Sequence, residues 1–166
     1  PTFYTRLLAR ADFTRDVTRT IRLFISGSSP LLPSTFTDFE ARTGQRILER
    51  YGMTETGMLT SNPYAGERRG GSVGLPLPGV HVRVADAGTG EVLPQGKTGV
   101  IEVSGPNVFS GYWRRPDLKA TEFCADGYFI TGDVGHIDTD GYVTIAGRAK
   151  DLVITGGLNV YPKEIE

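Results

Sequence analysis

Residues 128–133 read YFITGD, and Arg148 follows one turn and one further apolar run later, within GRAKD at 147–151. The apolar run 128–130 is typical of a short β-strand, here ending at an isolated carboxylate, Asp133. The segment 138–141, DTDG, is rich in turn-forming residues and precedes a second apolar run at 142–145. These segments predict a β-hairpin between the carboxylate of Asp133 and the guanidinium of Arg148.

A second dense cluster lies upstream at 51–57, where YGMTETG crowds the ring of Tyr51, two threonine hydroxyls and the acid Glu55 between glycines. The two clusters together suit a nucleotide. The ring can stack on a base, and an ionised Asp133 can accept hydrogen bonds from two ribose hydroxyls. The planar fork of Arg148 suits ribose and phosphate oxygens. Magnesium takes one or two carboxylates together with phosphate oxygens and water, so Glu55 suffices from the protein.

Taken singly, each group also has a plain structural interpretation. The segment 51–57 is compatible with a turn that has a capping threonine and a solvated Glu55. Asp133 is compatible with a strand-end carboxylate that accepts hydrogen bonds from turn amides. Arg148 is compatible with a surface salt bridge.

Composition bounds the class of protein. The 166 residues suffice for one domain with its own core. Lys plus Arg is 18 and Asp plus Glu is 19, so no net field favours nucleic acid or an anionic membrane. The single Cys124 excludes an internal disulfide framework and predicts a reducing compartment, the cytoplasm or, in a eukaryote, the mitochondrial matrix. No apolar run approaches the roughly 18 residues of a membrane span.

The first 70 residues alternate helical and extended patterns. Two stretches have apolar residues at helical spacing: Phe3, Leu7 and Leu8, and then Phe13, Val17 and Ile21. Residues 23–25 and 45–49 predict short strands. Between them, Ser34 is expected to cap a helix that stops near Gly44. This alternation is typical of a parallel or mixed sheet flanked by helices.

After about residue 70 the period changes to that of β-strands. Apolar and polar residues alternate at 80–84, and 99–103 predicts another short strand. Turn chemistry at 86–90 and 94–96 separates these runs, and 117–123 predicts one short helix. We expect a small antiparallel unit closed into a distorted β-barrel, since closure removes exposed edges.

Three ordered stretches resemble one enzyme superfamily: 51–57, 128–133 and 147–166, the last reading GRAKDLVITGGLNVYPKEIE. The linking sequences GSVGLPLPGV from Gly71 and SGPNVFSGYW from Ser104 fit as well. The chain resembles, over essentially its whole length, acyl-adenylate-forming enzymes, the superfamily of acyl-CoA synthetases, luciferases and peptide-synthetase adenylation domains.

The resemblance implies roles for individual residues. Tyr51 would stack on adenine, Thr54 would bind the α-phosphate, and Glu55 would hold magnesium. Asp133 would bind the ribose, and Arg148 would help to fix the nucleoside. ATP, magnesium and coenzyme A are the implied cosubstrates and cofactor. Further contacts to ATP or AMP would come from small or apolar neighbours: Ser28, Ser29, Pro30, Gly52 and Met53.

Other positions would serve the acyl group, the thiol and domain movement. Gly27, Gly57 and Met58 would line the acyl pocket. Gly156 and Gly157 would leave room for pantetheine, because a side chain there would obstruct a narrow channel. Lys150 would be the hinge between the large and small domains, where loop residues absorb backbone change during closure.

The resemblance also implies a domain organisation. Residues 1–70 would end the α/β subdomain of a large adenylating domain, 71–147 would form the barrel-like subdomain, and 148–166 would contain the hinge and the start of a small C-terminal domain. The family's phosphate loop is expected before Pro1 and its catalytic lysine after Glu166, in the remaining parts of the same enzyme. The isolated chain is therefore expected to be inactive.

The implied reaction is ATP-dependent activation of a carboxylic acid and transfer to coenzyme A. ERYGMTETGMLTSNPY from Glu49 resembles malonyl-CoA synthetases most, which implies malonate or methylmalonate. A second carboxylate needs a cation, because burying it unpaired is costly. The candidates are Arg22, Arg42, Arg46 and Arg50. Three alternatives remain: a ligase for medium-chain or aromatic acids, an adenylation domain that loads a carrier protein, and a non-catalytic nucleotide-binding fragment.

Overall fold

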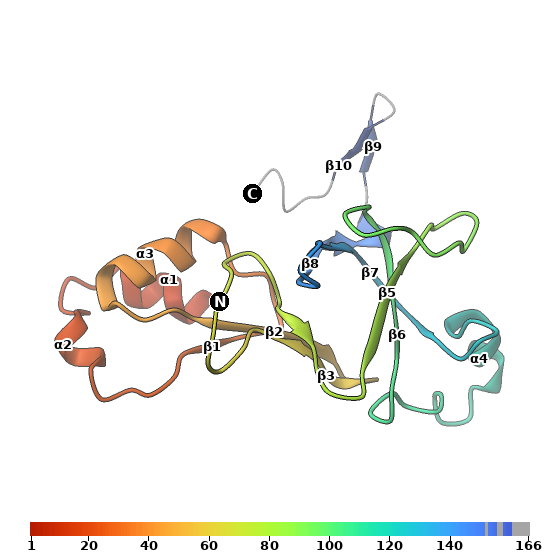
Figure 1. The fold of residues 1–166 in the computed structure, drawn as a ribbon, viewed down its shortest axis with the longest axis horizontal. Coiled ribbons are helices and arrows are strands. Elements are labelled where there is room, and N and C mark those ends of the chain that lie inside the picture. Colours follow the sequence, from red (N-terminus) through yellow and green to blue (C-terminus); the bar gives the residue numbers. More distant parts are fainter. Residues whose placement is uncertain (152, 156–157, 161–166) are drawn as a thin grey trace.

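The computed structural model describes residues 1–151, 153–155 and 158–160. It contains two four-stranded sheets that lie side by side along the long axis, with helices at both ends (Figure 1). The predicted fold class, helix-flanked mixed sheet followed by antiparallel strands, is confirmed at this level.

The first sheet is mixed. Strand β1 (Ile25–Ser26) runs parallel to β2 (Leu48–Met53), while β3 (Gly57–Ser61) and β4 (Leu75–Pro76) continue the sheet in antiparallel fashion. Helix α3 (Pro33–Thr43) connects β1 to β2, as a parallel pair requires a crossover. Both early strands begin two or three residues later than the sequence predicts.

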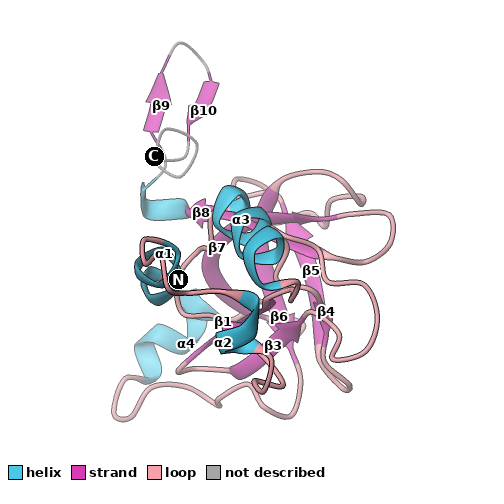
Figure 2. Cartoon of the chain, turned by 90° about the vertical axis from the view of Figure 1, so that its left-hand side faces the viewer, coloured by secondary structure: helices cyan, strands magenta, loops and turns pink. Residues whose placement is uncertain are grey.

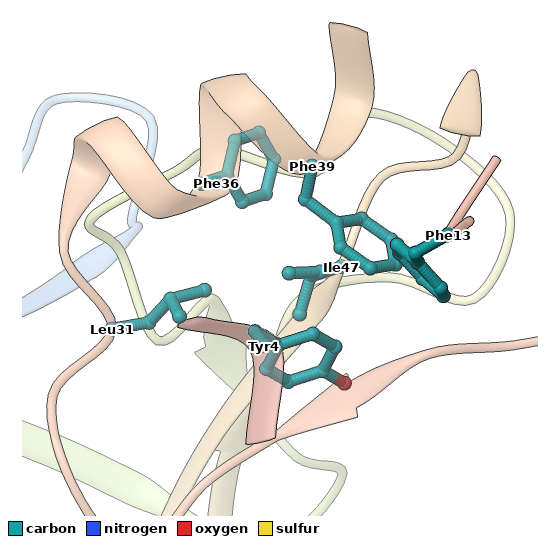
Figure 3. Close-up of a cluster of buried hydrophobic side chains, with 6 residues drawn as sticks. All are labelled: Tyr4, Phe13, Leu31, Phe36, Phe39 and Ile47. Atoms are coloured by element: carbon teal, nitrogen blue, oxygen red, sulfur yellow. The ribbon is translucent and has the colours of Figure 1, made fainter. Parts of the chain in front are cut away.

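Helices α1 (Thr2–Leu8) and α2 (Arg15–Thr18) pack with α3 on the β1–β2 side of the molecule (Figure 2). Their shared core centres on Phe39, which is fully buried and meets the ring of Tyr4 edge-on at 5.2 Å between centroids (Figure 3). Phe13, Phe36 and Ile47 complete the contact around it. This core holds the β1–α3–β2 unit in place.

Three details of the helical prediction are wrong. Phe3 is 77% exposed, and Val17 and Ile21 also face solvent. Tyr4 is buried in place of Phe3. Of the second predicted run only Phe13 is buried; it precedes α2, which is four residues long. Ser34 does not cap α3.

Leu32 holds the N-cap of α3, and Pro33 is the first helical residue. Proline suits that position because its fixed φ is helical and no amide hydrogen is needed there. The end of the helix is as predicted: Gly44 adopts φ +72° and its amide donates to the Glu40 carbonyl at 2.7 Å.

The second sheet is antiparallel throughout, in the order β5 (His81–Ala85), β6 (Gly99–Ser104), β7 (Phe129–Ile137) and β8 (Val143–Arg148). Helix α4 (Pro116–Glu122) lies at the far end, one residue from its predicted start. Ile101, Phe129 and Val143 form the core of this sheet together with Leu59 from β3. The hairpin β2–β3 is therefore docked on the second sheet.

The expected closed barrel is not formed by the described strands. β5 and β8 are the two edges of the sheet and do not pair with each other. The outer edge of β8 is instead covered by the segment before β4: Val143 exchanges backbone hydrogen bonds with Val73 and Gly74 at 2.8–2.9 Å. This pairing covers the first residue of the β8 edge and joins the two sheets without closure.

After β8 come a 3₁₀ turn, η1 (Ala149–Asp151), and the antiparallel strands β9 (Val153–Thr155) and β10 (Leu158–Val160). The first sheet extends to Pro76, beyond the expected limit at residue 70. The three domain boundaries remain a prediction. Within the described ranges, no helix has the length and apolar character needed to cross a bilayer.

Gly52 shows how closely the β2–β3 hairpin is packed. A Cβ atom there would lie 2.1 Å from the Gly57 carbonyl oxygen and 2.9 Å from Met58 Cα. We expect Gly52→Ala to lower the free energy of unfolding by about 1–3 kcal/mol or more, since the backbone must shift. Urea unfolding of the purified protein measures this. Gly88→Ala, which meets only the Asp86 side chain at 3.4 Å, is the control, and equal losses would contradict the explanation.

Candidate functional site

A cavity of about 330 Å³ lies where the two sheets meet. The first unit contributes the loop 26–30 and the strand residues 49–53 to its wall. The second contributes Asp133, Ile145 and Arg148. The structure thus brings together most of the predicted nucleotide contacts: Ser28, Ser29, Pro30, Tyr51, Gly52, Met53, Asp133 and Arg148. Gly27, predicted for the acyl pocket, lines the same cavity.

Asp133 is the central group of the cavity. It lies in the middle of β7, not at the end of a strand as predicted, and its register partner in β8 is Arg148. Arg148 Nε lies 2.9 Å from Asp133 Oδ1. The Tyr51 hydroxyl donates to the other oxygen, Oδ2, at 2.5 Å. One carboxylate therefore holds a cation from its own sheet and a phenol from the other.

The backbone around Asp133 is built to present it. Gly132 adopts φ +73°, a conformation that side chains other than hydrogen rarely tolerate. Thr131 Oγ1 donates to the Ile101 carbonyl at 2.8 Å and accepts from the Asp133 amide at 3.0 Å. Arg148 also donates to the Thr131 carbonyl at 3.1 Å. The segment 131–133 is thus fixed on both sides.

The environment shifts the acidity of this pair. Burial raises the pKa of the Asp133 carboxyl above its usual value, although the Tyr51 hydrogen bond and the Arg148 charge oppose the shift. Burial, and then the Asp133 charge, raises the pKa of the Tyr51 phenol. Tyr51 therefore stays a hydrogen-bond donor at neutral pH. An ionised carboxylate has about four acceptor sites, so Asp133 can still accept from ligand hydroxyls.

The remaining residues of the 51–57 cluster lie in and beyond the β2–β3 turn. Thr54 is exposed, and the Glu55 carboxylate accepts a hydrogen bond from the Tyr112 hydroxyl at 2.9 Å. Gly57 and Met58 open β3 and do not line the cavity. The cluster thus forms the β2–β3 hairpin, with Tyr51 on its first strand and Glu55 at its tip.

Lys150 lies in η1, immediately after β8, and is exposed. Its hinge role is a prediction. Gly156 and Gly157, the expected pantetheine positions, lie outside the described residues.

Two arginine candidates have structural roles. Arg42 donates to the carbonyls of Leu8 and Arg10, and Arg46 pairs with Glu40 at 2.7 Å. Arg50 alone among the four candidates lines the cavity. Its side chain runs beside Gly27: a Cβ at that glycine would lie 3.4 Å from Arg50 Cγ. No ion pair of Arg50 occurs in the described part of the chain.

Sequence reasoning missed several residues of the site. Glu49 is buried, lines the cavity and accepts from the Gly71 amide at 3.0 Å. Thr131 and Tyr112 hold the two acids in place. Tyr112 falls in the segment from Ser104 that resembles the superfamily, and this was the only signal for it. Thr131 lies in the stretch 128–133 that resembles the superfamily, but nothing in the sequence indicated its two hydrogen bonds.

A magnesium site fits these residues only together with a nucleotide. The described residues hold no group of three or more His, Cys, Asp or Glu side chains at coordinating distance. Glu55 Oε1 is occupied by Tyr112, while no hydrogen bond to its other oxygen occurs within the described ranges. One available carboxylate oxygen agrees with magnesium that takes its remaining ligands from phosphate and water.

Residues 1–113 match the family of AMP-binding enzymes, and the chain belongs to that family. Curated relatives over almost its whole length are coenzyme A ligases. A long-chain-fatty-acid–CoA ligase of Yersinia pestis is 40% identical over 166 residues, 99% of this chain and 29% of that protein. A malonate–CoA ligase of Arabidopsis thaliana is 41% identical over 175 residues, 100% of this chain and 28% of that protein. The chain thus spans less than a third of these relatives.

Solved structures agree with the fold. The crystal structure of ATP-bound MatB from Rhodopseudomonas palustris matches with a TM-score of 0.97 and 63% identity, over 100% of this chain and 33% of that one. A malonyl-CoA ligase bound to methylmalonyl-CoA and AMP matches with a TM-score of 0.79 and 43% identity, over 100% and 36%. The architecture is therefore part of the adenylate-forming fold.

Ser26 offers a test of the cavity wall. Its Oγ is buried and is the only buried side-chain oxygen without a hydrogen-bond partner among the described residues. We expect Ser26→Ala to leave the free energy of unfolding unchanged or to raise it by up to about 1 kcal/mol, because no hydrogen bond is lost.

Ser72→Ala is the matched control, since Ser72 is equally buried but bonds to Val143 and Gly74. It should cost about 1–3 kcal/mol. Equal losses for the two variants in chemical unfolding would show that Ser26 is satisfied after all.

The raised pKa of Asp133 predicts a pH dependence of stability. The stabilising contribution of Asp133 is fully present below the usual carboxyl pKa of 3.8. It is lost as the pH rises through the higher pKa of this carboxyl in the folded protein. The difference in unfolding free energy between wild type and Asp133→Asn should therefore fall as pH rises from about 4. Asp86→Asn should give the opposite slope, because the Thr89 and Gly88 amides lower the pKa of Asp86. Denaturation across pH measures both, and parallel slopes would contradict this assignment.

Proposed function

We propose that the enzyme containing this chain activates a carboxylic acid with ATP and transfers it to coenzyme A, and that the acid is malonate or methylmalonate. The cavity supports the first part. It combines a ring, a buried carboxylate and an arginine from two sheets, which suits a nucleoside monophosphate unit. The two curated relatives, both coenzyme A ligases, support the transfer to coenzyme A.

The chemistry begins with the carboxylate oxygen of the acid. It forms a bond to the α-phosphorus of ATP, the bond from that phosphorus to the bridging oxygen breaks, and pyrophosphate leaves. The thiol sulfur of coenzyme A then attacks the acyl carbon, the bond from that carbon to the AMP oxygen breaks, and the thiol proton is released. Both steps depend mainly on positioning and on neutralising charge.

In this proposal each side chain has one task. Asp133 accepts the ribose hydroxyls, Tyr51 forms the wall on which adenine stacks, and Arg148 directs its exposed guanidinium to ribose or phosphate oxygens. Thr54 and Glu55 face the phosphates from the hairpin tip. Magnesium, when bound, neutralises phosphate charge. Lys150 remains the proposed hinge.

The observation that carries the dicarboxylate is Arg50. It is exposed at the cavity, it has no ion pair within the described residues, and it lies beside Gly27, the proposed acyl-pocket residue. A cation at that place, without an ion pair in the part of the chain that the structure describes, offsets the charge of a second carboxylate. A monocarboxylate lacks the second charged group with which Arg50 would pair.

We expect the full-length enzyme to form AMP with malonate and methylmalonate and not with acetate, octanoate or benzoate. Arg50→Gln should raise the KM for malonate roughly 10- to 100-fold, since a hydrogen bond to a charged group is worth about 1.5–3 kcal/mol. Arg22→Gln, which removes an exposed arginine away from the cavity wall, should leave KM unchanged.

The acid panel separates the alternatives. Activity confined to octanoate or benzoate would overturn malonate while leaving the adenylate chemistry intact. Absence of AMP formation with every acid, alongside retained ATP binding, would overturn the ligase proposal itself.

A further inference from the structure

The tip of the β2–β3 hairpin is held by the loop 107–112, which is part of the connection between β6 and α4. Asn107 Nδ2 donates to the Thr56 carbonyl at 2.6 Å and to the Met58 carbonyl at 3.0 Å. The Phe109 amide donates to the Glu55 carbonyl at 2.8 Å. This loop thus donates hydrogen bonds to three backbone carbonyls of the hairpin, those of Glu55, Thr56 and Met58.

The same loop also contacts the Glu55 side chain. The Tyr112 hydroxyl donates to Glu55 Oε1 at 2.9 Å. Glu55 therefore has its backbone oxygen and one carboxylate oxygen bonded from positions 109 and 112. A glutamate at an exposed turn otherwise retains much of its rotamer freedom, whose loss costs up to about 2 kcal/mol. Here that freedom is already restricted before ligand binds.

The loop itself is anchored in the core of the second sheet. The Tyr112 ring meets Phe109 edge-on, with centroids 4.9 Å apart and planes at 76°. Phe109 in turn packs against Phe123 at 5.6 Å and Phe129 at 5.1 Å. Phe129 is buried and begins β7. An aromatic chain therefore runs from the sheet interior to the phenol that contacts Glu55.

We propose that Tyr112 is a positioning residue, which fixes the Glu55 carboxylate so that its second oxygen is oriented for the metal of bound MgATP. This inference rests on the proposed role of Glu55. Tyr112 is half-exposed, so its hydrogen bond adds little to folding. Its effect lies in orientation: partners that orient a metal-binding group typically change metal affinity 10- to 100-fold when removed.

The test uses the full-length enzyme and isothermal titration of ATP, once with Mg²⁺ and once with EDTA. The ratio of the two dissociation constants is the metal-dependent gain in affinity. In Tyr112→Phe we expect this gain to fall about tenfold while the dissociation constant in EDTA stays unchanged. In Glu55→Gln the gain should fall at least as far, and Tyr112→Phe should have no further effect in that background.

Tyr64→Phe is the matched control. The substitution removes an exposed hydroxyl that takes part in no side-chain hydrogen bond of the described residues. The metal-dependent gain in ATP affinity of this variant should equal that of wild type. A gain that is unchanged or larger in Tyr112→Phe, with the gain lost in Glu55→Gln, would overturn the positioning role and leave the proposed function intact. Equal weakening with Mg²⁺ and with EDTA would show a merely structural role and also overturn it. A gain retained in Glu55→Gln would overturn both the role of Glu55 and this inference.

Discussion

The buried carboxylate of Asp133 is the constraint on which the rest of the site depends. An ionised group removed from water must be paired and hydrogen-bonded, or it shifts to its neutral form. Arg148 supplies the charge from the neighbouring strand, and Tyr51 supplies a hydrogen bond from the other sheet. The register of β7 with β8 and the docking of β2 on the second sheet must both be correct before this carboxylate is satisfied.

Magnitudes separate what holds the two sheets together from what aligns them. Burying one large apolar side chain contributes about 1.5–3 kcal/mol, and Leu59 of β3 is fully buried in the core of the second sheet. The ion pair of Asp133 with Arg148 joins a buried carboxylate to a half-exposed guanidinium, and desolvation of the carboxylate offsets much of its attraction. The apolar contact therefore provides the attraction between the sheets, and the trio Tyr51, Asp133 and Arg148 selects one arrangement of them.

The sequence predicted those parts of the site that have a local signal. The hairpin between Asp133 and Arg148 follows from turn residues and apolar runs, and it places the two side chains as register partners. The contact of Tyr51 with Asp133 spans 82 positions, and no periodicity encodes it. Helical spacing likewise could not tell that Tyr4 rather than Phe3 is buried, because a two-turn helix has neighbouring faces of similar character. The prediction of a closed sheet was wrong, because β5 and β8 do not pair and the start of β8 instead bonds to residues 73–74, for which the sequence predicts no strand.

Strand β7 links the two ends of the proposed nucleotide site. Phe129, at its start, supports the aromatic chain that ends at Tyr112 and Glu55, and Asp133 lies four positions along the same strand. The hairpin β2–β3 contacts both ends as well, through Tyr51 on its strand and Glu55 at its tip. Strand β7 and the hairpin β2–β3 are thus linked twice, through Tyr51 and Asp133 and through the aromatic chain that ends at Glu55. Because each element contributes to both contacts, a displacement of β7 that moved Asp133, the proposed ribose acceptor, would also move the support of Glu55, the proposed magnesium ligand. The spacing between Asp133 and Glu55 is therefore set by strand β7, by the hairpin β2–β3 and by the bonded loop 107–112 that supports Glu55, as a site for a ligand of fixed length requires.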